Sequence, residues 1–165
     1  MDTTELRSHF LVSNLFVAGT ITLEPVDLDR VVLGGAVPLA EPLTLPTIPL
    51  LRASYFCERR EVGVLNIGGT GSVTVEGASF PLAAHDALYI GRGSRDVRFA
   101  SDNAETPARF YLVSYPAHAD YPTVHITPAD ADVLDLGSDE MANKRQVRRY
   151  IHLKGVRSAQ LVMGV

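Results

Sequence analysis

Four side chains in the middle of the sequence have types and spacing that could hold a metal ion. Glu61 is followed seven positions later by Gly68, and Tyr55 and Cys57 precede it where many small β-barrel enzymes carry two histidines. Asp96 stands further along, where such enzymes carry a third histidine. Cysteine and carboxylate groups can ligate divalent metals, so a site rebuilt from Cys57, Glu61 and Asp96 is one interpretation. We favour the other interpretation, a metal-free barrel, because the histidines are missing.

The same stretch offers a structural replacement for a metal. In an extended strand, Tyr55, Cys57, Arg59 and Glu61 would lie on one face. A carboxylate buried on that face needs a cationic partner or becomes protonated. We therefore expect the guanidinium of Arg59 to pair with Glu61 inside the barrel.

Other charged residues could contact a substrate. The candidates for binding a carboxylate with two parallel hydrogen bonds are Arg59, Arg60, Arg92 and Arg95. They could equally be surface charges or partners of Glu61, which is the interpretation we favour. His118 lies in the proline-containing stretch YPAHADYPT, a kind of loop that often carries binding residues. The five histidines have no metal-binding spacing, and no nucleophile arrangement is visible, so no catalytic residue can be assigned.

Short runs of branched and aromatic residues must position these side chains. They are bounded by turn-forming residues, and 13 glycines and 10 prolines punctuate the chain. This spacing predicts an all-β sandwich or barrel. The strands are expected within 19–26, 29–39, 62–69, 71–77, 85–93, 96–101, 108–116 and 123–128.

Two local patterns are clearer than the rest. In SVTVEGASF, Val73 and Val75 should face one side of a hairpin whose turn is Glu76–Gly77. Near the N-terminus, Asp2 and Glu5 have the spacing of a capping box, which predicts a short helix or arm.

The bulk composition excludes several classes of function. Hydrophobic residues make up 46% and charged residues 21% of 165 residues, with a net charge of −4. These values are ordinary for a globular domain, and they do not indicate binding to nucleic acid or membranes. The polar N-terminus is no signal peptide and Cys57 is the only cysteine, which favours the cytoplasm. The basic segment 144–157 could bind phosphates, but a solvated strand beside the acidic segment 128–140 is favoured.

The order of these patterns suggests three parts. We expect an N-terminal arm over 1–20, a metal-free barrel over 21–121, and a linker with the first strand or strands of a second, incomplete barrel over 122–165. The second barrel is suggested because AQLVMGV at 159–165 repeats the pattern of DRVVLGGAV at 29–37.

The pattern Glu-x6-Gly, a hairpin and then HDALYIGRGSRD resembles the cupin fold, a double-stranded β-helix or jelly roll. The resemblance implies a metal held by three histidines and a glutamate. Of these four ligands only Glu61 is retained here, since the other positions hold Tyr55, Cys57 and Asp96.

A narrower resemblance covers nearly the whole chain. The strings LRSHFLVSNLFVAG, YFCERREVGVLNIGG and TPARFYLVSYPAHADYPT resemble the 5-keto-4-deoxyuronate isomerase family. The resemblance implies a bicupin that interconverts aldose-type and ketose-type deoxy keto-uronates in bacterial pectin and uronate catabolism. It also implies a zinc ion and a homo-oligomer, usually a hexamer. The zinc ligands of the family lie in its second cupin, in a stretch without a counterpart here, so none is carried over.

Three functions remain open on this basis. The chain could be the non-metal N-terminal part of the isomerase, inactive alone. It could be a non-catalytic cupin module that binds a sugar acid or supports oligomerisation. It could also be a small free-standing cupin enzyme with a rebuilt metal site.

Overall fold

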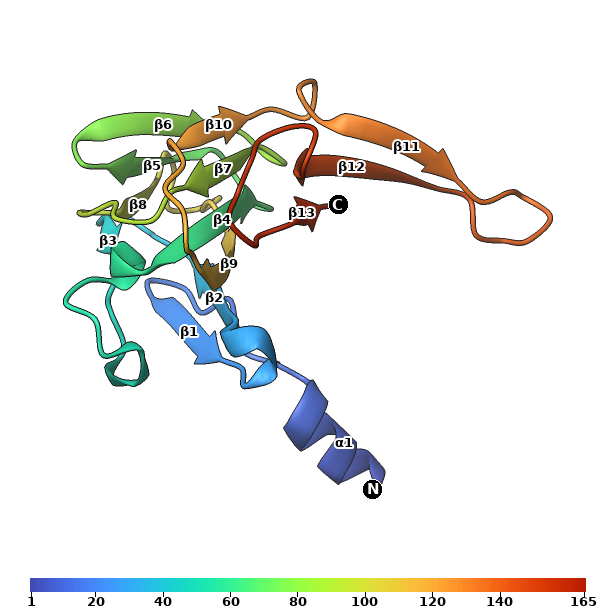
Figure 1. Ribbon diagram of the computed structural model, residues 1–165, viewed down its shortest axis with the longest axis horizontal. Helices are drawn as coiled ribbons and strands as arrows, with labels where there is room; N and C mark the ends of the chain where they lie inside the picture. The colour runs from blue at the N-terminus through green and yellow to red at the C-terminus, as the bar shows by residue number, and fades with distance from the viewer.

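Nearly all regular structure in the chain is β-strand, arranged in two facing sheets with a smaller third layer (Figure 1). The computed structural model describes residues 1–165. The six-stranded sheet has the order β1 (Ile21–Pro25), β2 (Val32–Ala36), β9 (Phe110–Pro116), β4 (Arg60–Asn66), β7 (Ala87–Ile90) and β10 (Val124–Ile126). The four-stranded sheet has the order β3 (Leu43–Thr44), β8 (Arg98–Ser101), β5 (Gly71–Val75) and β6 (Ala78–Leu82). Neighbouring strands are antiparallel and the sheets do not close, which is a jelly-roll arrangement and confirms the expected all-β cupin-type fold.

The main core lies between these two sheets and consists of 17 buried residues. Val73 and Val75 of β5 point into it, as the alternation in the sequence predicts. The turn after β5 has positive φ values at Glu76 and Gly77, 50° and 86°, which match the twist of a two-residue hairpin. All eight expected strand regions contain a strand of the structure.

Strand β4 is buried on both of its faces. Val62 and Val64 point into the main core, whereas Leu65 belongs to a second cluster of 8 buried residues on the outer face of the six-stranded sheet. Gly63 lies on that outer face, where an added Cβ would be 2.8 Å from the Cε atom of Met163. The absence of a side chain at Gly63 therefore lets the C-terminal segment pack directly on β4.

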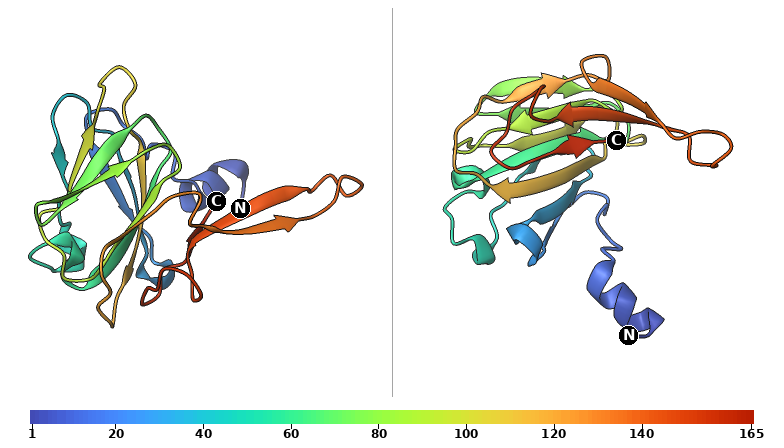
Figure 2. Two further views of the ribbon diagram at one scale, coloured as in Figure 1. Left: turned by 90° about the horizontal axis from the view of Figure 1, so that it is seen from above. Right: turned by 45° about the vertical axis from the view of Figure 1, so that its right-hand side comes forward.

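The C-terminal segment forms the third layer. Strands β11 (Asp132–Leu136), β12 (Arg145–Ile151) and β13 (Met163–Gly164) make a small antiparallel sheet. The β11–β12 hairpin projects away from the two larger sheets in both views of Figure 2. Acidic Asp132 lies opposite basic Arg149 in this hairpin, as expected for a solvated strand beside an acidic one.

The remaining elements are short. Helix α1 (Thr3–Phe10) has the capping box between Asp2 and Glu5 and buries no residue. Three turns of 3-10 helix follow along the chain: η1 (Leu28–Arg30), η2 (Pro49–Leu51) and η3 (Phe56–Glu58). No helix has the length and apolar character that crossing a bilayer requires.

The six-stranded sheet includes β10 and so runs to Ile126, past the boundary expected at residue 121. Residues 1–20 contain α1 and no strand, and the division of the chain into an arm and a barrel stays a prediction. That 122–165 begins a second barrel stays a prediction.

Candidate functional site

The stretch from Tyr55 to Glu61 is not one extended strand, because η3 interrupts it. A 3-10 turn advances three residues per turn, so the two-residue alternation assumed for this stretch is broken. Cys57 is buried in the main core, while the Arg59 side chain is 61% exposed. The Nη2 atom of Arg59 donates to the backbone carbonyls of Leu51 and Arg52. The expected pairing of Arg59 with Glu61 is therefore wrong.

Glu61 points to the outer face of β4 and is fully buried. Its carboxylate accepts four hydrogen bonds, each 2.7 Å long, from the Tyr89 hydroxyl and from the backbone N–H groups of Ala159, Gln160 and Leu161. Burial and the bond to Glu61 raise the pKa of Tyr89, so that this hydroxyl remains a donor. The buried carboxylate is satisfied by these donors and fixes the C-terminal segment on the sheet.

The four cupin ligand positions do not converge. No group of three or more histidine, cysteine, aspartate or glutamate side chains is placed to hold a metal ion. Cys57 is packed among the apolar side chains of the main core, where burial raises the pKa of its thiol to about 12. Tyr55 packs under the guanidinium of Arg95, 4.5 Å from the ring centroid, and Asp96 is exposed in the loop before β8. The residues at these positions do not fit a zinc ion.

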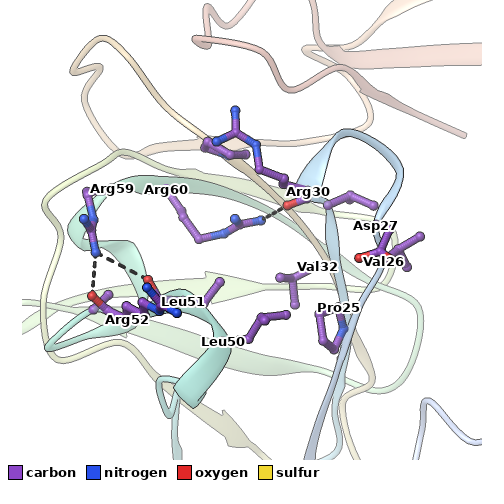
Figure 3. Close-up of a pocket in the computed structure, with 13 residues that line it drawn as sticks. Pro25, Val26, Asp27, Arg30, Val32, Leu50, Leu51, Arg52, Arg59 and Arg60 are labelled. Atoms are coloured by element: carbon purple, nitrogen blue, oxygen red, sulfur yellow. Dashed lines mark hydrogen bonds between the residues drawn. The ribbon is translucent and has the colours of Figure 1, made fainter.

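A cavity of about 460 Å³ lies between η2 and the turn that joins β1 to β2 (Figure 3). Arg60, the first residue of β4, forms part of its wall and is only 6% exposed. Its Nε atom donates to Ser114 Oγ at 3.1 Å. Its Nη2 atom donates to the backbone carbonyls of Ser114 and Arg30, at 2.7 and 2.8 Å. The adjacent Ser114 hydroxyl donates to the Glu61 carbonyl, so these bonds tie β4 to β9 and to η1.

Positive charge dominates this cavity. The charged residues that line it are Asp27, Arg30, Arg52, Arg59 and Arg60. Burial and the nearby charge of Arg30 lower the pKa of Arg60 to about 10, so it stays protonated at neutral pH. None of the ion pairs in the structure includes Arg60. The sequence pattern singled out Arg59 and Arg60, but it gave no signal for Arg30 and Arg52, which the fold brings from other segments.

The other candidate residues lie elsewhere. Arg92 pairs with Asp120 at 2.6 Å, and His118 is exposed in the loop after β9. His125 contacts Asp86 at 3.0 Å on the edge strand β10, a polar pair that the sequence did not suggest. None of these side chains lines the arginine cavity.

Two solved structures show the class of fold. An IolB-like protein from Salmonella typhimurium LT2 aligns over 72% of this chain and 43% of its own length, with a TM-score of 0.55 at 20% identity. Protein YlbA from E. coli aligns over 86% of this chain and 60% of its own, with a TM-score of 0.53 at 15% identity. At these identities the likeness concerns the fold alone, a cupin-type jelly roll.

The sequence comparison is more specific. Residues 51–165 match the KduI/IolB family model, and the chain belongs to this family. It is 51% identical over 164 residues to the 4-deoxy-L-threo-5-hexosulose-uronate ketol-isomerase of Formosa agariphila and 47% identical to that of Halalkalibacterium halodurans. Each match includes 99% of this chain and 59% of the relative. The chain thus spans about three fifths of the length of these relatives, and the resemblance seen in its motifs is confirmed.

Proposed function

We propose that this chain serves in a ketol-isomerase that acts on 4-deoxy-L-threo-5-hexosulose-uronate, and that it supplies the non-metal first barrel. The observation that carries the proposal is the 51% identity to an enzyme of that name across 99% of the chain. The reaction converts an aldose-type into a ketose-type deoxy keto-uronate. The proposed setting is uronate breakdown in a bacterial cytoplasm, in a homo-oligomer such as a hexamer.

Zinc belongs to this proposal through the family resemblance, but not through the residues of this chain. Its cupin ligand positions are spread over a buried thiol, an exposed loop and an outward-facing carboxylate whose hydrogen bonds are satisfied. We therefore assign no catalytic step to Tyr55, Cys57, Glu61 or Asp96. The zinc and its ligands are proposed to lie in the part of the relatives that this chain does not match.

A second candidate function is a non-catalytic cupin module that binds a sugar acid. The arginine cavity favours it, because four arginines there face a single aspartate. The two functions are compatible if one barrel binds and another catalyses.

The test is a coupled isomerase assay with the deoxy keto-uronate as substrate. The 165-residue chain with added zinc would be compared with a fusion that carries the remaining part of the Formosa agariphila relative. We expect turnover in the fusion and none above background in the chain alone. Turnover by the chain alone would overturn the placement of catalysis elsewhere, and a folded, zinc-loaded fusion without activity would overturn the isomerase proposal.

A further inference from the structure

Arg60 is a buried cation that does not use all of its hydrogen-bond donors. Its Nε and Nη2 atoms are engaged by Ser114 and by the carbonyl of Arg30, whereas Nη1 makes no hydrogen bond. Buried arginines are almost always paired with a carboxylate or another anion, and this one is not. The cavity gives the free nitrogen access to an anion from solution.

The neighbouring charges favour an anion at the same place. The charge of Arg30 acts on Arg60 and opposes its protonation, so a bound anion would relieve the repulsion between the two. Arg52 and Arg59 also line the cavity, and the bonds from Arg59 to the carbonyls of Leu51 and Arg52 keep its guanidinium beside the cavity (Figure 3). Asp27 is the one acidic residue among those that line the cavity, and Glu58, 4.0 Å from the Nε atom of Arg59, offsets part of the charge of that arginine.

The apolar walls of the cavity indicate what kind of carbon skeleton the ligand has. Pro25, Val32, Leu51 and Pro116 present apolar surface to the cavity. The volume of about 460 Å³ lies within the range of roughly 300–1,000 Å³ that small-molecule sites occupy. Because Nε and Nη2 of Arg60 already donate to Ser114 and Arg30, the N–H groups of Nη1 are the ones left for an anion. Burying the apolar wall needs an anion that carries a carbon skeleton, which an organic carboxylate has and inorganic phosphate lacks.

We infer that this cavity binds the carboxylate of a small organic acid, with Arg60 as its principal contact and the apolar wall holding the carbon skeleton. Among such acids a six-carbon uronate fits the proposed function, and only this choice of ligand rests on that function. The site itself stands on the buried arginine, the surrounding charge and the cavity.

Calorimetric titration of the 165-residue chain tests the inference directly. The titrants are D-glucuronate, pyruvate, inorganic phosphate and D-glucose as the uncharged control. We expect saturable binding of glucuronate, at least about tenfold weaker binding of phosphate and none of glucose. Phosphate binding as tight as the carboxylates, or no binding of either carboxylate, would overturn it. Binding of pyruvate without glucuronate would keep the carboxylate site and reject the uronate.

Three substitutions locate the binding. Arg60→Met should weaken glucuronate binding at least about 30-fold, equivalent to about 2 kcal/mol. Leu50 lines the cavity but is 69% exposed, so changes there spare the core. Leu50→Glu places a competing carboxylate at the mouth and should weaken binding about tenfold or more, while the uncharged Leu50→Gln should stay within about twofold.

The Leu50 pair keeps the inference testable if Arg60→Met does not fold. Unchanged glucuronate affinity in Leu50→Glu, or equal losses in both Leu50 variants, would show that the anion binds elsewhere. Because binding is read without turnover, an inactive fusion would count against the isomerase proposal and leave this result standing.

Discussion

Glu61 and Leu161 lie 100 residues apart in the sequence, yet the backbone N–H of Leu161 donates to the Glu61 carboxylate at 2.7 Å. The N–H groups of Ala159 and Gln160 donate to the same carboxylate. A single side chain of the six-stranded sheet thus satisfies three consecutive backbone donors of the C-terminal segment. This contact and the apolar cluster around Gly63 together hold the segment on β4.

Replacing Glu61 by glutamine should loosen the C-terminal segment. An amide keeps one acceptor oxygen and turns an NH₂ group towards backbone N–H donors, so at least one buried donor loses its partner. Each such loss costs about 1–3 kcal/mol, and the lost charge weakens the remaining bonds. We expect Glu61→Gln to lower the free energy of unfolding by about 3 kcal/mol in urea titrations.

The matched control is Glu24→Gln, since Glu24 is exposed on β1. It should change the free energy of unfolding by no more than about 0.5 kcal/mol. Hydrogen exchange adds a local readout, because the amides of 159–161 should lose protection in Glu61→Gln. Retained protection there would show that these amides do not depend on the carboxylate.

Tyr89 gives the second prediction, which depends on pH. Its hydroxyl donates to Glu61 and its pKa is raised in the folded protein, so the native state keeps a proton that the unfolded chain releases above about pH 10. Stability therefore falls as pH rises past 10, because the native state then binds more protons than the unfolded state. Tyr89→Phe should cost about 1.5–3 kcal/mol near neutral pH and show a shallower decline above pH 10.

Unfolding free energies measured from pH 8 to pH 11 would check this. The raised pKa values of Tyr111 and Tyr150 contribute to both proteins, so the difference between them isolates Tyr89. Parallel pH profiles would mean that Tyr89 titrates alike in the folded and unfolded chains.

The strands could be predicted from sequence because branched residues alternate between turn-forming residues, as in Val73 and Val75. The direction in which the Glu61 side chain points could not be predicted, because a three-residue 3-10 turn at 56–58 shifts the alternation of side chains. No local sequence pattern indicates that turn. The partners of Glu61 could not be predicted either, since they are backbone N–H groups about 100 residues away, and backbone groups leave no pattern in the sequence. The sequence likewise indicated Arg60 as a candidate residue but not its neighbour Arg30, which lies 30 residues earlier and comes beside Arg60 only in the folded chain.

The two adjacent arginines provide the third prediction, because they face opposite environments. Arg59→Ala removes an exposed side chain and should change the free energy of unfolding by less than about 1 kcal/mol. Arg60→Ala removes two buried hydrogen bonds and one partly buried one, and leaves the carbonyls of Ser114 and Arg30 without that donor, at a cost of about 2 kcal/mol or more. Thermal and urea unfolding of both variants would rank them. A larger effect at Arg59 would restore the inward orientation expected from strand alternation.

The last prediction concerns the thiol of Cys57, at one of the cupin ligand positions. Cys57 is 1% exposed and burial raises its pKa to about 12, so the native protein holds almost no thiolate at pH 8. A disulfide reagent such as dithiobis-nitrobenzoate should therefore leave the native chain unmodified over minutes and label its single cysteine fully in denaturant. The exposed position in Ser79→Cys is the matched control and should be labelled at once in the native state. Below about pH 12 any native reaction should accelerate about tenfold per pH unit, since the thiolate fraction does. Rapid native labelling at pH 8 that added zinc suppresses would contradict both the buried thiol and the misfit of this position to a metal.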